Sequence, residues 1–336
     1  MPVDIGIDIG GTNIKLGLVD GNGRILARRL LATQARRGPR KALERIAKTV
    51  ERLRRIKRIR SIGVGIAGLV DHVHGIVRVP PNLPGWHGTA VKSLLEELTG
   101  LPVTCGNDAN AVTAGEWLCG AGRGCRDLFC LTLGTGVGGG AVVNGRLVLG
   151  ANDAAGELGH TVIYGNGPDC ECGGKGCLER YIGARYILQR AKQRLRVQSR
   201  RAQHRNQTSF VPGVGERPSA MLDLASGDLG GLTTKVIGRA ARAGDELALT
   251  LVQEVGFYLG LGLVNVVALL DPERIVIGGG VSRMGAPLLR AVKQTVFGRG
   301  QVFSGRRLEI VFAQLGNDAG IIGASRLRDV TGVEPV

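Results

Sequence analysis

Apolar positions along the chain follow two periods, and the two kinds of segment alternate. Short apolar runs bounded by glycine, proline or polar residues predict buried strands, and they span residues 3–9, 14–19, 25–31, 61–66, 103–106, 131–133, 137–143, 274–277 and 308–312. Apolar residues three and four positions apart predict helices, and these span 41–54, 91–98, 108–118, 179–195, 233–242, 245–270 and 319–328. Strands that alternate with helices in this way predict an α/β fold.

One pattern of strand, glycine turn and return strand occurs twice. Residues 7–12 end a strand in a Gly/Thr turn, and residues 131–136 do the same. We therefore expect two α/β lobes of similar build, residues 1–118 and 119–336, each presenting one hairpin to a shared cleft. The alternative is that both segments are turns that only reverse the chain.

The charge balance is strongly basic. The chain has 336 residues, 43% of them hydrophobic, so it can bury a large core, and its formal net charge is +16. The excess is concentrated in residues 24–60 and 190–205. Such a balance suits a nucleic acid, an anionic membrane or an anionic substrate, and it also arises on solvated helix faces. Residues 196–230 are polar, basic and interrupted by proline and glycine, which predicts an inserted loop of unassigned role.

Cysteine usage indicates a reducing compartment. Seven cysteines, an odd number with three in one short cluster, argue against a disulfide scaffold. The other four lie among apolar residues, as reduced thiols do in cytosolic proteins. Met1 leads directly into a strand without a signal peptide, and no apolar run is long enough to span a membrane. We expect a cytoplasmic protein with no membrane partner.

Three cysteines and a histidine close together in the chain predict a metal site. The expected ligands are His160, Cys170, Cys172 and Cys177. Thiolate and imidazole are the ligand set of tetrahedral zinc, and four protein ligands complete its shell. The zinc ion is therefore expected to be structural rather than catalytic.

Two carboxylates bracket these ligands. Glu157 precedes His160, and Glu179 follows the last cysteine, so the metal would hold both near one place. Carboxylates that accept hydrogen bonds from vicinal hydroxyls are what sugar recognition requires, and His160 could offer its second ring nitrogen to the same ligand. For Glu179 the alternative is a carboxylate in the first turn of a helix, stabilised by the helix dipole.

The repeated glycine turns suit phosphate groups. Gly10-Gly11-Thr12 and Gly134-Thr135-Gly136 expose backbone N–H groups and add a hydroxyl. Neither turn is a Walker A or a G-x-G-x-x-G sequence. With Asp8, which could hold Mg²⁺ or merely cap its turn, they predict a nucleoside triphosphate held between two hairpins. Lys15 could face either the phosphates or solvent.

Two further segments complete the predicted site. Gly278-Gly279-Gly280 follows a strand and precedes a helix, so an adenine or ribose could lie against its bare backbone, although a plain tight turn is the alternative. Asn107 and Asp108 lie between a strand and a helix. Asp108 could be a helix N-cap, or it could be the general base that phosphoryl transfer to a hydroxyl requires.

Taken together, these residues resemble the ROK family, which contains bacterial glucokinases, other hexose kinases and related transcriptional repressors. The resemblance covers nearly the whole chain, and it is most specific in two segments. Residues 133–160 fit the family signature, and residues 170–179 fit the pattern C-x-C-G-x-x-G-C-x-E. The resemblance implies the actin-like ATPase fold, an α/β fold with two lobes around a hinged cleft.

The resemblance also implies roles for individual residues. Asp108 would be the catalytic base acting on the 6-hydroxyl of the sugar. The sugar would be bound by Gly68, Asn82, Asn107, Asp108, Glu157, His160 and Glu179. MgATP would be bound by Asp8, Gly10, Gly11, Thr12, Thr135 and Gly136, and Lys15, Gly279 and Gly280, placed beside the same ligand by their turns, complete that set.

The expected activity is ATP-dependent phosphorylation of glucose at the 6-hydroxyl, which gives glucose 6-phosphate and ADP. The alternatives are another hexose (mannose, fructose, N-acetylglucosamine or N-acetylmannosamine), polyphosphate as the donor, or a sugar-responsive transcriptional regulator. Repressors of the family carry an N-terminal helix-turn-helix module, and a phosphate strand that begins at residue 3 leaves no room for one. Nucleic acid is therefore not expected as a partner. A homodimer or homotetramer is expected from the resemblance alone.

Overall fold

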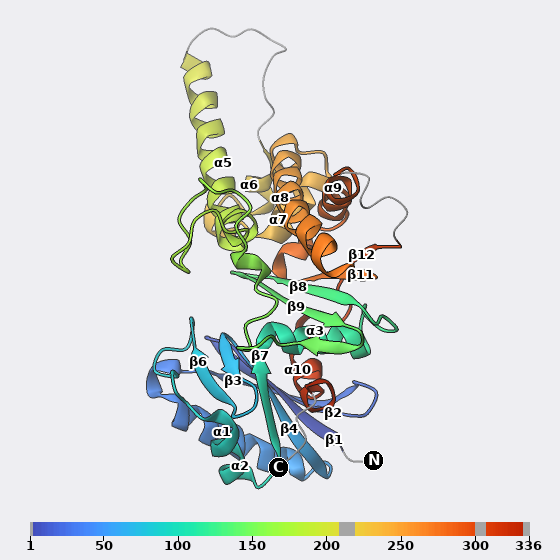
Figure 1. Cartoon of the computed structure of the whole chain (residues 1–336). Helices are drawn as coiled ribbons and strands as arrows, with labels where there is room; N and C mark the ends of the chain where they lie inside the picture. The colour runs from blue at the N-terminus through green and yellow to red at the C-terminus, as the bar shows by residue number, and fades with distance from the viewer. Residues whose placement is uncertain (1–2, 208–218, 300–306, 332–336) are drawn as a thin grey trace.

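The computed structural model describes residues 3–207, 219–299 and 307–331, and it is built around two five-stranded mixed sheets (Figure 1). From edge to edge, the first sheet consists of β3 (Ile25–Ala32), β2 (Asn13–Val19), β1 (Val3–Ile9), β4 (Ile59–Ile66) and β7 (Val103–Asn107). The second consists of β10 (Arg146–Val148), β9 (Val137–Val143), β8 (Leu128–Leu133), β11 (Arg274–Gly278) and β12 (Glu309–Phe312). A separate hairpin pairs β5 (Leu69–Asp71) with β6 (Ile76–Val79).

Helices flank both sheets. The helices of the first half are α1 (Pro39–Arg54), α2 (Val91–Thr99) and α3 (Asp108–Cys119). Those of the second half are α4 (Glu179–Ile182), α5 (Ala184–Gln207), α6 (Ala220–Leu224), α7 (Thr234–Arg242), α8 (Glu246–Leu270), α9 (Ala286–Phe297), α10 (Ala319–Ala324) and α11 (Leu327–Val330). Single 3₁₀ turns at Leu158–His160 and Gly280–Met284 lie in segments that the sequence assigned to the site.

The repeat predicted from the glycine turns extends to the strand order of both sheets. β1 pairs antiparallel with β2 and parallel with β4, while β8 pairs antiparallel with β9 and parallel with β11. Both glycine hairpins therefore follow the carboxyl end of a central strand. In α/β sheets that edge is where ligands bind.

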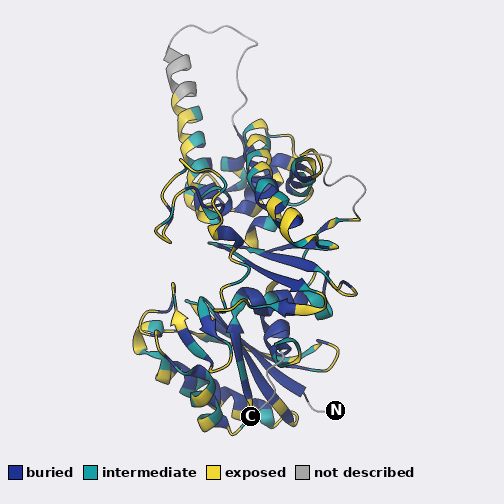
Figure 2. Cartoon of the chain, viewed as in Figure 1, coloured by how far each residue is buried: buried dark blue, intermediate teal, exposed yellow. Residues whose placement is uncertain are grey.

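Each sheet has its own core, visible as buried strands in Figure 2. In the first lobe, alternate residues of β1 such as Ile5 and Ile7 are fully buried, and they belong to one cluster with Leu43 and Ile46 of α1. The apolar stripe predicted for residues 41–54 is thus the face that α1 buries against the sheet.

The layer between the two sheets consists of α3 and α10 (Figure 1). A Cβ built on Gly323 would lie 1.6 Å from the carbonyl oxygen of Ala111, so the two helices touch through their backbones. α10 also packs against β1 and β4. The end of the described chain therefore returns to the first sheet, and the division of the chain at residues 118 and 119 stays a prediction.

Replacing Gly63 with alanine is expected to destabilise this contact. A Cβ at Gly63 would lie 1.7 Å from the carbonyl oxygen of Ala324, which is backbone and cannot rotate away. Overpacking of this kind costs roughly 1–3 kcal/mol, and thermal unfolding of the variant measures it. Gly21→Ala is the control, because a Cβ there meets nothing within 4 Å. Equal melting temperatures for the two variants would contradict the close approach of α10.

The structure corrects three of the expected elements. The helix predicted for residues 179–195 is broken at Gly183, and its second part, α5, continues to Gln207 into the predicted loop 196–230. Residues 219–230 contain α6 and a 3₁₀ turn, whereas residues 208–218 of the predicted loop lie outside the described residues. The helix predicted for residues 319–328 is two short helices, α10 and α11.

The expectation that no apolar run is long enough to span a membrane was also wrong. Among the described residues, α8 is long and apolar enough to do so, judged by length and composition alone. Half of that apolar window is buried inside the fold, and α8 packs against α7 and α9. Its hydrophobicity is that of a central core helix of the second lobe.

Candidate active site

Asp108 begins α3 directly after the last residue of β7. The N-cap role is filled by its neighbour, because the Asn107 side-chain oxygen accepts hydrogen bonds from the backbone N–H of Ala109 at 2.7 Å and of Asn110 at 3.1 Å. The Asn107 side-chain nitrogen donates to the carbonyl oxygen of Gly68 at 2.9 Å. Asn107 thus joins Gly68 to the helix start, and the Asp108 carboxylate is not needed as the N-cap.

The surroundings of Asp108 suit a carboxylate with a high proton affinity. Burial raises its pKa to about 6, and the nearby carboxylates of Asp8 and Glu157 add to this effect. Hydrogen bonds from the local backbone, including one from Ala109, oppose it. A pKa near the working pH is what a general base needs.

The first glycine turn places Asp8, Lys15 and Asn82 together. The ammonium of Lys15 forms a 2.9 Å ion pair with the carboxylate of Asp8 across the β1–β2 hairpin. The sequence left open whether Lys15 faces the phosphates or solvent. In the structure its ammonium points to Asp8. A Cβ on Gly11 would lie 2.7 Å from the carbonyl oxygen of Asn82, so the turn needs glycine at this contact. Thr12 is exposed at the tip of the hairpin.

Two hydrogen bonds at the base of the first turn fix its position. The backbone N–H of Gly10 donates to the carbonyl oxygen of Asn13 at 3.0 Å. The hydroxyl of Thr33 donates to the carbonyl oxygen of Gly10 at 2.6 Å. These bonds fix Gly10 at the end of β1, so the tip of the hairpin rests on an anchored base.

The second glycine turn lies against Glu179. The Glu179 carboxylate accepts a 2.8 Å hydrogen bond from the backbone N–H of Val137, and a Cβ on Gly136 would lie 2.5 Å from the same oxygen. Glu179 occupies the first turn of a helix, α4, which was the alternative considered from the sequence. It also joins that helix to the turn beside the exposed Thr135.

Glu157 completes a group of acidic side chains around Asp108. Burial raises the pKa of Glu157, the ring of His160 opposes that rise, and the carboxylate of Glu179 adds to it. Glu157 therefore lies close enough to Asp108, His160 and Glu179 to share electrostatic interactions with each. Residues from both lobes meet at this point.

The four predicted metal ligands are gathered in one place. One ligand atom from each of His160, Cys170, Cys172 and Cys177 lies within 4.8 Å of the others. The Cys170 sulfur lies 3.8 Å from His160 Nδ1, and the sulfurs of Cys172 and Cys177 are 3.7 Å apart. Sulfur ligands at about 2.3 Å from a tetrahedral zinc ion lie about 3.8 Å from one another. Donor type and spacing both fit zinc.

Gly279 and Gly280 lie beside the second turn. Gly279 has φ +85°, and a Cβ there would lie 2.4 Å from the carbonyl oxygen of Leu133, the last residue of β8. The hydroxyl of Thr234 donates to the carbonyl oxygen of Gly280 at 2.8 Å. The strand and turn predicted here are present, but a 3₁₀ turn precedes the helix α9.

The largest basic segment lies mostly on the face of the first sheet opposite α10, although its Arg45 donates to the carbonyl oxygens of Ala32 and Thr33 beside the first glycine turn. Residues 36–60 contain twelve basic and two acidic side chains, mostly on and after α1. α1 packs on the face of the first sheet that carries Ile5 and Ile7, whereas α10 packs on the face that carries Gly6. The helix layer beside the site is thus on the opposite face of the sheet from α1.

Sequence reasoning missed one part of the site. The backbone N–H of Ala184, which begins α5, donates to the carbonyl oxygen of Gly134 at 2.9 Å, and Gly183 approaches the carbonyl oxygen of Thr135. Gly183 is a recognisable break inside an apolar helical pattern, and that break was the available signal.

Comparisons with known proteins agree with this geometry. The ROK family model matches residues 4–330. The chain is 35% identical to a glucokinase of Streptomyces coelicolor over 97% of this chain and 98% of that protein, and 38% identical to a glucokinase of Halalkalibacterium halodurans over 96% and 94%. It superimposes with a TM-score of 0.79 on a ROK glucokinase from Streptomyces griseus in complex with glucose and AMPPNP, at 35% identity over 97% and 98% of the two chains. The chain belongs to the ROK family and has its two-lobed, actin-like ATPase fold.

Proposed function

We propose that this protein phosphorylates glucose at the 6-hydroxyl with ATP and releases glucose 6-phosphate and ADP. The observation that carries the proposal is Asp108, a carboxyl at the start of α3 whose pKa is raised by burial and by the nearby carboxylates of Asp8 and Glu157. The full-length similarity to the glucokinases above supports glucose and ATP as the substrates.

The reaction is a direct transfer of the γ-phosphoryl group. As the sugar 6-oxygen forms its bond to phosphorus, the bond from phosphorus to the β,γ-bridging oxygen breaks, and ADP leaves with that electron pair. Asp108 takes the proton of the 6-hydroxyl. Its raised pKa makes it a stronger base than an ordinary aspartate, and it is still ionised at neutral pH.

The sugar is proposed to lie between the two lobes. Gly68, Asn82, Asn107, Glu157, His160 and Glu179 are the proposed ligands of its hydroxyl groups. Asn107 and Gly68 are already joined by a hydrogen bond, and Glu157, His160 and Glu179 interact electrostatically. A pocket that pairs every hydroxyl discriminates strongly against sugars that leave its polar groups unpaired.

The nucleotide is proposed to lie across the two glycine turns. Asp8, Gly10, Gly11, Thr12, Lys15, Thr135, Gly136, Gly279 and Gly280 form its proposed site. Asp8 would hold Mg²⁺, which neutralises charge that develops on the phosphates. The Asp8 carboxylate already pairs with the ammonium of Lys15 at 2.9 Å.

Zinc is the proposed structural ion of the loop that carries Glu157 and Glu179. His160, Cys170, Cys172 and Cys177 would hold it, and four protein ligands leave no open position for catalysis. The remaining expectations stay proposals: a cytoplasmic homodimer or homotetramer that binds neither a membrane nor nucleic acid.

The direct test is ADP release from MgATP with a panel of glucose, mannose, fructose, N-acetylglucosamine and N-acetylmannosamine. We expect turnover with glucose at the highest kcat/KM. Higher kcat/KM with another sugar would replace glucose as the substrate. If no sugar supports ADP release, polyphosphate replaces ATP in the same assay, with sugar phosphate as the measured product. Sugar binding without turnover with either donor would instead favour a regulator.

The pH dependence of the reaction should report Asp108. Since its pKa is raised to about 6, the carboxylate is protonated at lower pH and can no longer accept the hydroxyl proton. We expect kcat/KM for glucose to fall about tenfold per pH unit below about pH 6 and to level off above about pH 7. Measurement from pH 5 to 8 checks this. An activity that stays constant down to pH 5 would contradict the assignment.

A further inference from the structure

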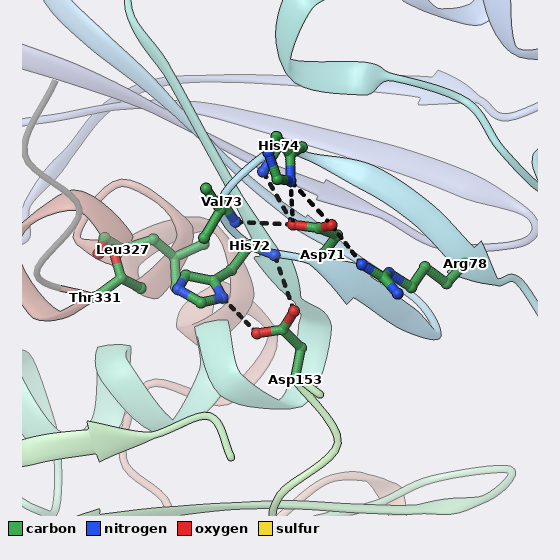
Figure 3. A network of polar contacts seen from close by, with 8 residues as sticks. All are labelled: Asp71, His72, Val73, His74, Arg78, Asp153, Leu327 and Thr331. Carbon is green, nitrogen blue, oxygen red and sulfur yellow. Dashed lines mark hydrogen bonds and ion pairs between the residues drawn. The ribbon is translucent and has the colours of Figure 1, made fainter. Parts of the chain in front are cut away.

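One contact joins the two lobes outside the residues assigned to catalysis (Figure 3). His72 lies in the turn between β5 and β6, and Asp153 lies in the loop after β10. His72 Nδ1 and Asp153 Oδ1 form an ion pair, and the backbone N–H of His72 donates to Asp153 Oδ2 at 3.3 Å. Three other ion pairs among the described residues, Arg28–Asp318, Arg60–Asp329 and Arg326–Asp4, tie the returning end of the chain to the first sheet. The His72–Asp153 pair instead links the segments that form the two sheets, residues 3–107 with residues 120–207, 219–299 and 307–315.

Hydrogen bonds to Asp71 hold the turn that carries His72. Asp71 accepts hydrogen bonds from the backbone N–H of Val73 at 3.1 Å and of His74 at 3.0 Å, and from the Arg78 guanidinium at 2.6 Å. The bonds from His74 and Arg78 lower the pKa of Asp71 well below its usual range, and all three bonds hold the turn. His72 and Asp153 have side-chain exposures of 22% and 14%, so solvent screens their contact less than a surface pair.

Each partner leads directly to a proposed sugar ligand. Four residues before His72 is Gly68, whose carbonyl oxygen is bonded to Asn107. Four residues after Asp153 is Glu157. Between them Gly156 lies against β9, where its Cβ would be 2.7 Å from the carbonyl oxygen of Gly139. A contact between His72 and Asp153 therefore restrains the distance between the Gly68–Asn107 side and the Glu157 side of the site.

We propose that His72 and Asp153 are positioning residues that join the two lobes and pre-order the sugar site. This inference rests on the proposed glucose kinase activity. A site built from two lobes must be ordered when sugar binds, and a contact already in place reduces that ordering cost. Neither residue is among the proposed ligands of sugar or nucleotide, and both are closer in sequence to proposed sugar ligands than to the nucleotide turns.

The kinetic test compares His72→Ala and Asp153→Asn with the wild type. Asparagine suits position 153 because it tolerates the left-handed φ of +58° found there. Loss of a charged, partly buried hydrogen bond should raise the glucose KM by about tenfold in each variant. We expect kcat to change less than about threefold and the ATP KM to stay unchanged, since the nucleotide turns are not restrained by this pair.

The chain offers a matched control in the same turn. His74 Nδ1 contacts Asp71 at 3.1 Å, so His74→Ala also removes a histidine–aspartate contact, but one that lies within a single lobe. We expect His74→Ala to leave the glucose KM unchanged. His72→Gln, which keeps a hydrogen-bond donor, should recover part of the loss. In the double variant His72→Ala/Asp153→Asn the effect should not exceed that of the larger single change.

Three results would overturn the proposal: an unchanged glucose KM in both single variants, an equal rise in His74→Ala, or additive effects in the double variant. Amide hydrogen exchange tests it independently of activity. In the full protein without ligands, residues 149–157 should exchange faster in His72→Ala than in the wild type or His74→Ala. Unchanged exchange there would also reject the restraint. A wild type that does not phosphorylate glucose would reject the proposed function, while exchange would still decide the contact.

Discussion

Asp108→Asn is expected to lower kcat for glucose phosphorylation by about 10²–10⁴-fold, the usual contribution of a general base. Asparagine has nearly the same size but cannot accept the proton of the 6-hydroxyl. Glucose affinity should stay within a few-fold, because the neighbouring Asn107 keeps its bonds to the helix and to Gly68. Steady-state kinetics with MgATP measures kcat, and titration calorimetry measures glucose binding.

The stability of this variant separates chemistry from unfolding. The pKa of Asp108 is raised from 3.8 to about 6, so the folded protein binds more protons than the unfolded chain in that range. Its charge therefore reduces stability as pH rises through this window, and the penalty is complete above it. At pH 7.5 we expect Asp108→Asn to be at least as stable as the wild type.

Asp20→Asn is the matched control for the loss of charge. Asp20 accepts backbone hydrogen bonds in the turn after β2, at the end of that strand away from the glycine hairpin. Its replacement should leave kcat unchanged. Near-normal turnover by Asp108→Asn would show that another group takes the proton.

Removal of zinc is expected to have the second large effect. Cys172→Ala deletes a ligand whose side chain is exposed, so the change removes metal binding without leaving a cavity in the core. We expect the bound zinc to fall from about one ion per chain to near zero. Structural zinc in finger peptides contributes ~10–16 kcal/mol, so the melting temperature should fall clearly even if one loop receives only a fraction of that.

The same change should weaken glucose binding. The zinc loop carries His160, and it runs between Glu157 and Glu179, so its disorder releases three proposed sugar ligands at once. Loss of outer support at metal sites typically costs 10–100-fold, and we expect the glucose KM to rise by a similar factor. Metal analysis, calorimetry and kinetics measure the three effects.

Cys119→Ala separates zinc loss from the general loss of a thiol. Cys119 is a free cysteine at the end of α3, outside the ligand group. It should retain zinc and the glucose KM. Wild-type protein purified without chelators and found to contain no zinc would contradict the metal assignment itself.

Local sequence was sufficient wherever the signal and the structure are both local. The apolar run at 3–9 is β1, residues 137–143 are β9, and the apolar pattern at 245–270 is α8 to within one residue. The proposed metal ligands are equally local, because three cysteines lie within eight positions and His160 lies ten residues before the first of them. The repeated turns predicted two lobes of similar build, and the structure contains two five-stranded sheets with corresponding strand orders.

Elements without a clear period were not predicted. β5 and β10 each have three residues, too few to show alternation. α5 continues past residue 195 through a polar, arginine-rich segment with no apolar stripe. Arginine, glutamine and alanine favour a helix even where no apolar stripe is present. The polarity of this segment therefore led to the wrong prediction of a loop.

Contacts between distant segments were decided only by the tertiary structure. Lys15 faces Asp8, Asn107 rather than Asp108 caps α3, and α10 lies against the bare backbone of Gly63. Glu116 is fully buried, and its carboxylate accepts hydrogen bonds from Ala121, Gln314 and Leu315. Nothing in the neighbouring sequence marks such partners.

The physical reason is that periodicity and turn chemistry depend only on residues that are neighbours along the chain. Sequence alone therefore determined the family and the two-lobed α/β fold, and it also supplied the residues of the site that we propose. Which side chains meet across the lobes, such as His72 and Asp153, depends on how two sheets pack around α3 and α10. That packing also sets the burial that raises the pKa of Asp108.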